Sequence, residues 1–223
     1  MKSEAEKWDK GCKNDNVRNH FIIPTLSKLL TESTAQRVLD VGSGTGYIAR
    51  SIVPLVSHKM KWALLDVDQA RVEFTKKHIP TDMEVEIFTG DFLGKLDLGE
   101  PYDFVLLLFT LLEVNLSREL FLKIKSHVNE NGYVVIAMPD SLEDVLQAAI
   151  NKPILLTHFL NGECVLEKTD KFTRTKYPFK AHRFEFIVQL MLFAGFSLVK
   201  MYSYKNSGKE TYMIVFRKDD DLG

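Results

Sequence analysis

A glycine-rich loop directly after a short apolar segment constrains this chain more than any other feature. Residues 37–41, Arg-Val-Leu-Asp-Val, have the pattern of a buried strand, and Gly42, Gly44 and Gly46 follow at alternate positions. Glycine accepts the backbone angles of a sharp turn and lets backbone N–H groups approach a ligand closely. A helix that starts near Tyr47 would direct its positive N-terminal end to the same place. The pattern predicts a cofactor-binding turn, and the alternative is an ordinary strand-to-helix turn.

Asp40 distinguishes this loop from the loops that bind dinucleotides. In the dinucleotide pattern G-x-G-x-x-G the third glycine comes one residue later than Gly46 does here. An ionised carboxylate beside the loop would repel a phosphate, but it could orient loop amides or hold an ammonium group. The pattern D-x-G-x-G-x-G resembles the first motif of the class I S-adenosylmethionine-dependent methyltransferases, and the chain is most similar to their small-molecule type. The resemblance implies that Asp40 and the three glycines bind the methionine part of S-adenosylmethionine.

Composition limits the remaining possibilities. The 223 residues, of which 45% are hydrophobic and 26% charged, suit one α/β domain spanning residues 1–223. A net charge of -1 disfavours nucleic acid as the main substrate. Cys12 and Cys164 lack metal-ligand spacing, so we expect reduced thiols and no metal site. No apolar run reaches membrane-spanning length, and we expect a cytoplasmic protein without a membrane partner.

Acidic residues follow the next two predicted strands. The strand at residues 61–66 ends in Asp66, twenty residues after Gly46, where a doubly wound fold places a carboxylate that binds ribose hydroxyls. The alternative for Asp66 is a surface carboxylate. Asp68 is better suited to cap the helix that runs to about His78.

The third predicted strand, residues 84–88, leads to Asp91 and Phe92. In the family that this sequence resembles, Asp91 would bond the adenine amino group and Phe92 would lie against the ring. A carboxylate and an aromatic side chain suit the donor and the π-face of adenine. Alternatively, Asp91 caps a short turn and Phe92 fills the core.

The first 32 residues are predicted to be helical, with Asn14 or Asp15 as a cap and a kink or division at Pro24. In many small-molecule methyltransferases that this sequence resembles, the N-terminal helix folds over the cofactor as a lid. Trp8 and Arg18 are therefore candidates for cofactor binding. The alternative for Trp8 is to pin the first helix to the body.

The fourth predicted strand, residues 104–108, opens onto residues 109–114 at the edge where active residues gather in open α/β sheets. Glu113 lies where related small-molecule enzymes often place a polar group, so it is a catalytic candidate. Its alternative is the first-turn acid of a helix. The segment matches neither the Asn/Asp-Pro-Pro-Tyr motif of amino-methylating DNA enzymes nor a Pro-Cys nucleophile, which makes DNA bases poor substrate candidates.

Residues 151–180 are too long for a simple connection, and their apolar content favours an inserted cap. Segments 165–168 and 172–175 are predicted to pair as a hairpin. The aromatic residues of the insert would then line an acceptor pocket; they are Phe159, Phe172, Tyr177 and Phe179.

Histidine is the side chain best suited to act as a general base near neutral pH. His182 follows the insert, in a segment that resembles the His-Arg segment of many small-molecule members, and His158 is a weaker second candidate. The alternative for His182 is a helix-capping or core histidine.

The remaining pattern predicts helices at residues 117–129 and 183–194, strands at 133–138, 196–204 and 211–216, and a turn at 206–208. The resemblance implies a Rossmann-like, doubly wound sheet of order 3-2-1-4-5-7-6 with an antiparallel last strand.

We therefore expect S-adenosylmethionine-dependent methyl transfer to an O or N atom of a small, largely apolar or aromatic molecule, by a monomer or homodimer. The alternatives are a peptide or protein methyltransferase, a non-catalytic S-adenosylmethionine-binding partner subunit, and a nicotinamide-dependent oxidoreductase.

Overall fold

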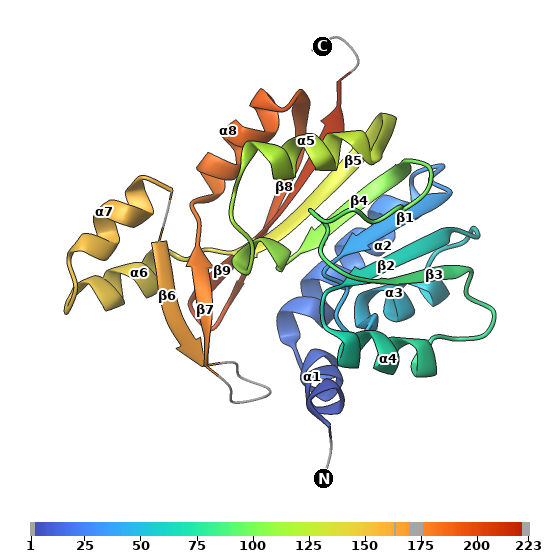
Figure 1. Cartoon of the computed structure of the whole chain (residues 1–223), viewed down its shortest axis with the longest axis horizontal. Coiled ribbons are helices and arrows are strands. Elements are labelled where there is room, and N and C mark those ends of the chain that lie inside the picture. The colour runs from blue at the N-terminus through green and yellow to red at the C-terminus, as the bar shows by residue number, and fades with distance from the viewer. Residues whose placement is uncertain (1–2, 163, 170–175, 220–223) are drawn as a thin grey trace.

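The computed structural model describes residues 3–162, 164–169 and 176–219. Within them, seven strands form one sheet in the order β3-β2-β1-β4-β5-β9-β8, and β6 and β7 form a separate pair (Figure 1). The strands are β1 (Arg37–Val41), β2 (Lys61–Asp66), β3 (Val85–Thr89), β4 (Tyr102–Leu108), β5 (Val128–Pro139), β6 (Cys164–Thr169), β7 (Lys176–Ala181), β8 (Phe196–Asn206) and β9 (Lys209–Lys218). Strands β1 to β5 run parallel, and β9 runs antiparallel to both β5 and β8. The predicted strand order and the antiparallel last strand are confirmed.

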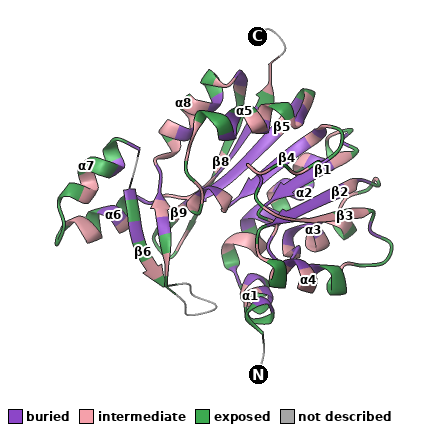
Figure 2. Cartoon of the chain, in the orientation of Figure 1, coloured by how far each residue is buried: buried purple, intermediate pink, exposed green. Residues whose placement is uncertain are grey.

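Helices cover both faces of the sheet. They are α1 (Glu4–Lys13), α2 (Ile23–Thr31), α3 (Tyr47–Ile52), α4 (Gln69–His78), α5 (Arg118–Ser126), α6 (Leu142–Ala149), α7 (Ile154–Leu160) and α8 (Phe184–Phe193), with shorter turns η1 (Arg18–Ile22), η2 (Val53–Leu55) and η3 (Thr110–Leu112). In Figure 1, α5 and α8 lie in front of the sheet and α2 and α3 behind it. One apolar core fills each side of the sheet, and the central strands are buried along most of their length (Figure 2). This is the doubly wound arrangement that the sequence predicts.

Several element bounds differ by a few residues from the prediction, and two features of the observed bounds have a clear local or tertiary cause. Helix α3 ends at Ile52 and continues as a single tight turn, because Pro54 has no N–H to donate to the preceding turn. Strand β5 begins at Val128, which pairs with Tyr102 of β4 across an irregular register. The helix predicted at residues 117–129 ends earlier, at Ser126 of α5, and the turn signal Asn131-Gly132 lies inside β5, with a φ of 60° at Asn131. Pairing with neighbouring strands therefore overrides the local turn signal.

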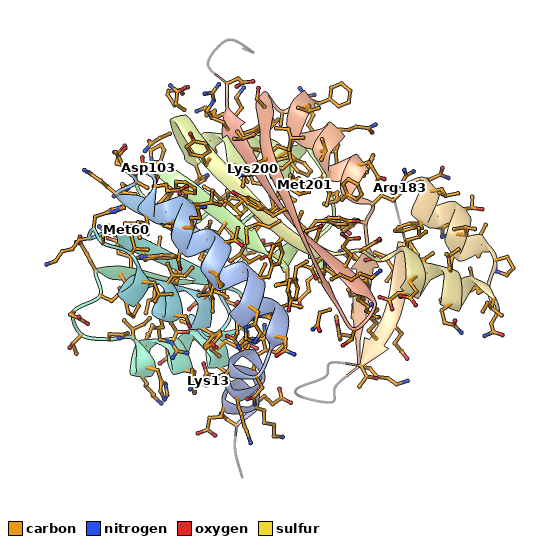
Figure 3. All side chains as sticks on the ribbon, turned by 180° about the vertical axis from the view of Figure 1, so that it is seen from behind. Lys13, Met60, Asp103, Arg183, Lys200 and Met201 are labelled. Atoms are coloured by element: carbon orange, nitrogen blue, oxygen red, sulfur yellow. The ribbon has the colours of Figure 1, made fainter. Side chains whose placement is uncertain are left out.

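The N-terminal segment is divided at the predicted place. The side chain of Asp15 accepts a hydrogen bond of 2.9 Å from the Val17 amide, so Asp15 rather than Asn14 caps the second part. Pro24 cannot donate to the turn before it, and the chain adjusts through the π-helical turn η1, in which the amide of Ile23 bonds to the Arg18 carbonyl. Helix α2 lies on the rear face of the sheet, which Figure 3 shows from that side.

The insert forms a small unit of its own beside the sheet (Figure 1). Helices α6 and α7 pack against the β6–β7 pair around a separate apolar cluster, which contains Val145, Phe159, Cys164, Leu166, Phe179 and Ala181. In β6 and β7, Thr169 pairs with Lys176. The predicted second strand, residues 172–175, lies outside the described residues, and so does Phe172.

Candidate active site

The glycine loop joins β1 to α3 and is tightly packed. Gly42, Gly44 and Gly46 all have positive φ, at 75°, 60° and 68°, which side chains other than glycine rarely adopt. A β-carbon on Gly42 would lie 2.7 Å from Oγ1 of Thr110, and one on Gly46 would lie 2.9 Å from Cγ2 of Thr75. The loop therefore needs glycine for its backbone angles and for close approach of neighbouring elements.

From the sequence we expected the loop amides to point to a ligand, but several of them bond to the protein itself. The amides of Gly42 and Ser43 both donate to the Leu65 carbonyl, at 2.8 and 3.0 Å, and the Gly46 amide donates to Ser43 at 3.0 Å. The Gly44 amide donates to Oδ2 of Asp66 at 2.7 Å. These bonds fix the loop onto the end of β2. The protein thus supplies a rigid turn whose own donors are largely satisfied.

Asp40 is a buried acid at the base of the loop, with 2% of its surface exposed. Burial, and after it the charge of Asp66, raises the pKa of Asp40 to about 7. A buried acid in this state is suited to a cationic group, because a nearby positive charge would favour the ionised form.

Asp66 ends β2 and is 4% exposed. Its two carboxylate oxygens accept hydrogen bonds from the amides of Gly44 at 2.7 Å and Asp68 at 2.9 Å. An ionised carboxylate offers about four acceptor positions, so capacity remains for hydroxyl donors. The side chain of Asp68 accepts from the amides of Ala70 and Arg71 and caps α4, as predicted.

Asp91 and Phe92 take up positions that match the structural alternatives stated for them. Oδ1 of Asp91 accepts a bond of 2.9 Å from the Leu93 amide and closes a short turn, while the residue itself is exposed just beyond β3. The ring of Phe92 is 6% exposed and packs in the core, 5.4 Å from the His127 ring. Asp91 remains available to a ligand. The contact predicted between Phe92 and adenine stays a prediction without a supporting contact.

Helix α1 lies against the glycine loop, and Trp8 lies next to Gly44. Its Nε1 lies 3.2 Å from the position that a β-carbon on Gly44 would take. The guanidinium of Arg71 lies 4.3 Å from the centre of the Trp8 ring. Helix α1 therefore lies next to the glycine loop, and its role as a lid over the cofactor stays a prediction.

Asp9, next to Trp8, was not singled out from the sequence. It is 3% exposed, and its carboxylate accepts hydrogen bonds from Oγ1 of Thr45 at 3.2 Å and from the guanidinium of Arg50. Nζ of Lys13 also forms an ion pair with Oδ2 of Asp9, at 2.9 Å. Burial alone would raise the pKa of Asp9, but Lys13 and Arg50 outweigh it and hold the pKa below its usual value. No spacing in the sequence indicates this contact between α1 and the loop, and only the tertiary structure reveals it.

Arg18 reaches the same edge of the sheet from η1. Its guanidinium forms a 2.7 Å ion pair with Asp15 and lies 4.8 Å from the centre of the Phe109 ring. Phe109 directly follows β4 and has a φ of 67°, an uncommon angle for a bulky residue; such strained residues cluster at functional sites. Its neighbour Thr110 donates to the Val41 carbonyl at 2.5 Å. Thr110 was not named from the sequence, although the segment that contains it was.

The two catalytic candidates lie farther from the loop. Glu113 is exposed at the end of η3, and α5 begins only at Arg118, so it is not the first-turn acid of a helix. His182 is 5% exposed, and its Nε2 donates to the Leu111 carbonyl at 2.9 Å. Its Nδ1 is buried without a hydrogen bond to any described residue. Burial lowers the pKa of His182 despite the hydrogen bond to Leu111, and the neutral form is therefore favoured.

A comparison with models of protein families identifies the family to which this chain belongs. The model described as "Methyltransferase domain" matches residues 15–191, well over half of the chain. Among curated proteins, no sequence match was found. The chain belongs to the methyltransferase domain family, and family and fold together confirm the predicted class I S-adenosylmethionine-dependent enzymes. The nicotinamide-dependent alternative and the non-catalytic alternative are thereby removed.

Solved structures share the fold at low sequence identity. The N-methyltransferase NodS from Bradyrhizobium japonicum WM9 has a TM-score of 0.62 at 11% identity, over 93% of this chain and 99% of that chain. The glycopeptide N-methyltransferase MtfA, complexed with S-adenosylhomocysteine, has a TM-score of 0.68 at 13% identity, over 92% and 90%. Magnesium protoporphyrin IX methyltransferase (ChlM) from Synechocystis PCC 6803 has a TM-score of 0.66 at 13% identity, over 93% and 86%.

The residues around the loop fit S-adenosylmethionine. The glycines leave no room for side chains, Asp40 is a buried carboxylate suited to an ammonium group, and Asp66 keeps acceptor capacity at the end of β2. No group of three His, Cys, Asp or Glu side chains that could hold a metal occurs in the described part of the chain. Every helix among the described residues is too short or too polar to cross a membrane.

Proposed function

We propose that this methyltransferase acts on an O or N atom of a small, largely apolar or aromatic molecule. The cofactor supplies a methyl group already activated by its sulfonium, so the chain's task is to position the acceptor and exclude water. In this proposal Asp40 faces the ammonium group, Asp66 the ribose hydroxyls and Asp91 the adenine. The class of acceptor is inferred from the edge of the sheet next to the loop.

Two partly exposed aromatic rings at that edge, Phe109 and Tyr204, are the observation that supports a small aromatic or apolar acceptor. Phe109 directly follows β4, and its neighbour Thr110 packs against Gly42. The ring of Tyr204 stacks on Phe21 of η1, which lies in the core, with centroids 5.4 Å apart. Tyr204 lies near the end of β8, which runs parallel to β5, so it belongs to the same carboxyl edge. Aromatic surfaces bind flat, apolar molecules and exclude water.

The insert contributes to this edge through its strand β7. His182 follows β7 and holds the Leu111 carbonyl, and Nζ of Lys180 donates to Asn115 at 2.6 Å. Phe159 and Phe179, which were predicted to line the acceptor pocket, are 3% and 2% exposed inside the insert's own cluster. We therefore assign the insert the task of holding η3 in place.

His182 is, in this proposal, a positioning residue rather than a general base. A base would be reachable by the acceptor, whereas both ring nitrogens of His182 are buried. We expect His182→Gln, whose amide can still donate to Leu111, to keep most of the turnover, and His182→Ala to lose more. A general base would instead show a loss of about 10²–10⁴-fold in both variants, together with a changed pH profile of kcat.

The acceptor class is tested by following the methyl group. The protein is incubated with S-adenosylmethionine labelled in its methyl group and with a cell extract separated into protein, peptide and small-molecule fractions. We expect the label in the small molecules that partition into organic solvent. Label in the protein or peptide fraction would contradict the proposal and favour the peptide or protein alternative. Gly44→Val serves as the control for label that does not depend on this enzyme.

A further inference from the structure

Helix α6 of the insert carries an exposed row of large aliphatic side chains. Leu142, Leu146 and Ile150 follow one another at a spacing of four residues, and they are 42%, 47% and 70% exposed. Residues four apart lie on the same face of a helix, so the three side chains form one row about 12 Å long, the α6 stripe. Single exposed leucines are common on protein surfaces, but a contiguous apolar row marks a surface that binds a partner.

The stripe is not the face that attaches α6 to the insert. That task belongs to Val145, which is buried, and to Ala148, and both pack in the insert's own apolar cluster. In Figure 1, α6 and α7 lie on the far side of the β6–β7 pair from the seven-stranded sheet. A surface helix needs only one apolar side to pack on its own domain. The second apolar side of α6 therefore requires an occupant from outside this chain.

Charges of opposite sign lie at the two ends of the stripe. Asp140 and Glu143 stand at its start, and Glu143 is exposed. Lys152, also exposed, stands at its end, where its amide donates to the Ala149 carbonyl at 3.2 Å and so continues the helical turn beyond the stripe. A second copy of the same helix, placed antiparallel, would bring the basic end of each stripe to the acidic end of the other.

We propose that the α6 stripe is the surface through which two copies of this chain form a dimer, with the two α6 helices antiparallel about a two-fold axis at Leu146. Leu146 of each copy then meets its own counterpart, and Leu142 of each copy faces Ile150 of the other. A two-fold contact uses the same patch on both subunits, so the patch must be complementary to itself. The proposal goes beyond methyl transfer and does not depend on the class of acceptor.

The charges select a second copy over other occupants of the stripe. In the antiparallel arrangement Lys152 of each copy lies level with Asp140 of the other and within one helical turn of Glu143. Opposite charges meet at both ends, and like charges are kept apart. A lipid surface or an unrelated protein has no need of an acid at one end of the row and a cation at the other.

Leu146→Cys tests the contact directly, because a residue on the two-fold axis meets its own counterpart. The two natural cysteines, Cys12 and Cys164, are buried and do not compete. Under mild oxidation of the full chain we expect Leu146→Cys to give a covalent dimer on a non-reducing gel. Leu122→Cys is the matched control, because Leu122 lies on α5 and is also 47% exposed, and it should stay monomeric. Absence of the covalent dimer in Leu146→Cys, or an equal yield in the two variants, would overturn the proposal.

Sedimentation equilibrium measures the dimer without a cross-link. Because the contact is small, we expect a dissociation constant of roughly 1–100 μM for the unmodified chain. Leu146→Glu places two like charges on the axis and should weaken the dimer about tenfold or more, whereas Leu122→Glu should not. The affinity of Leu146→Glu for S-adenosylhomocysteine should stay within about twofold, which shows that the variant is folded. A chain that is monomeric at about 1 mM, or a dimer that Leu146→Glu leaves intact, would overturn the proposal.

A charge exchange tests the antiparallel arrangement. Glu143→Lys puts like charges together at both ends of the stripe and should weaken the dimer about two- to fivefold. Adding Lys152→Glu to the same chain restores the opposite charges and should restore the dimer. If the double variant is weaker than Glu143→Lys alone, the two helices do not meet in this orientation and the proposal is wrong.

Discussion

The glycine loop and the insert are attached to the same edge of the sheet by different kinds of contact. Around the loop, the buried acids Asp9 and Asp66 accept hydrogen bonds from neighbouring elements, and little of either is exposed. The insert has its own small core and is joined to β9 mainly through Asp144, which binds Lys168 at 2.5 Å and Lys209 at 2.6 Å. Buried charged contacts are costly to break, whereas partly exposed ion pairs contribute little. Cofactor binding should therefore depend on the loop and be largely independent of the insert.

Gly44→Val gives the largest expected effect on the loop side. The branched side chain would be forced to a φ of 60° and pushed against Trp8. We expect the affinity for S-adenosylhomocysteine, measured by isothermal titration calorimetry, to fall about 100-fold or more, together with a loss of roughly 1–3 kcal/mol of stability from backbone strain.

Gly208→Val provides the matched control for this substitution. Gly208 has a φ of 85° in the β8–β9 turn, and nothing lies within 4 Å of the position of an added β-carbon. Gly208→Val should lower stability through backbone strain without lowering the affinity for S-adenosylhomocysteine. Equal affinities for the Gly44 and Gly208 variants would show that the loop has been wrongly assigned as the cofactor site.

Asp66→Ala should have the next largest effect. The substitution removes a charged acceptor from the ribose hydroxyls and from the Gly44 amide, and the expected loss is about 1.5–3 kcal/mol of binding free energy, or roughly 10–100-fold in Kd. Asp68→Ala removes the neighbouring carboxylate, which caps α4, and should cost about 1 kcal/mol of stability with little change in Kd. If the two variants bind S-adenosylhomocysteine equally well, the ribose assignment of Asp66 is wrong.

The pH dependence of binding tests the role of Asp40. With a pKa of about 7, the carboxyl group of the ligand-free protein is mostly protonated below neutral pH. An ammonium group beside it favours the ionised form, so binding must release the proton, and affinity should rise with pH until about pH 7. Between pH 5.5 and 7 the expected gain in affinity for S-adenosylhomocysteine is roughly tenfold.

Two measurements test whether the affinity rises with pH and whether binding releases a proton. Calorimetry in buffers with different ionisation enthalpies should detect release of close to one proton per ligand near pH 5.5. Asp40→Asn should bind with an affinity that is flat over the same range. A wild-type affinity that does not change with pH, or proton uptake in place of release, would rule out an ammonium group beside Asp40.

Asp144→Ala should have the smallest effect on the cofactor side. It removes the shared partner of Lys168 and Lys209 and loosens the insert, at an expected cost of about 1 kcal/mol because the three side chains are partly exposed. Hydrogen exchange should increase in β6 and β7, while Kd for S-adenosylhomocysteine stays within about twofold of the wild-type value. A large fall in cofactor affinity would show that the insert and the loop form one unit after all.

The sequence alone determined the scaffold of the cofactor site. The bounds of β1 and β2, the three glycines, Asp66 at a strand end and Asp68 as a cap were all readable, because each follows from a local pattern of a few residues. A turn at residues 206–208 was predicted for the same reason, and within it Ser207 and Gly208 have positive φ. Local steric and hydrogen-bonding preferences act over a few residues, so a short segment of sequence reveals them.

Only the tertiary structure decided which side chains meet. Asp9 contacts a loop some 36 positions away, and Nε2 of His182 bonds to a carbonyl 71 positions away. Phe92, Phe159 and Phe179 are ligand-lining candidates in the sequence, but packing places all three in apolar cores. An aromatic or acidic residue has the same identity whether it faces a ligand or a neighbouring helix. The choice depends on burial and on partners brought from distant parts of the chain, and no local pattern encodes it.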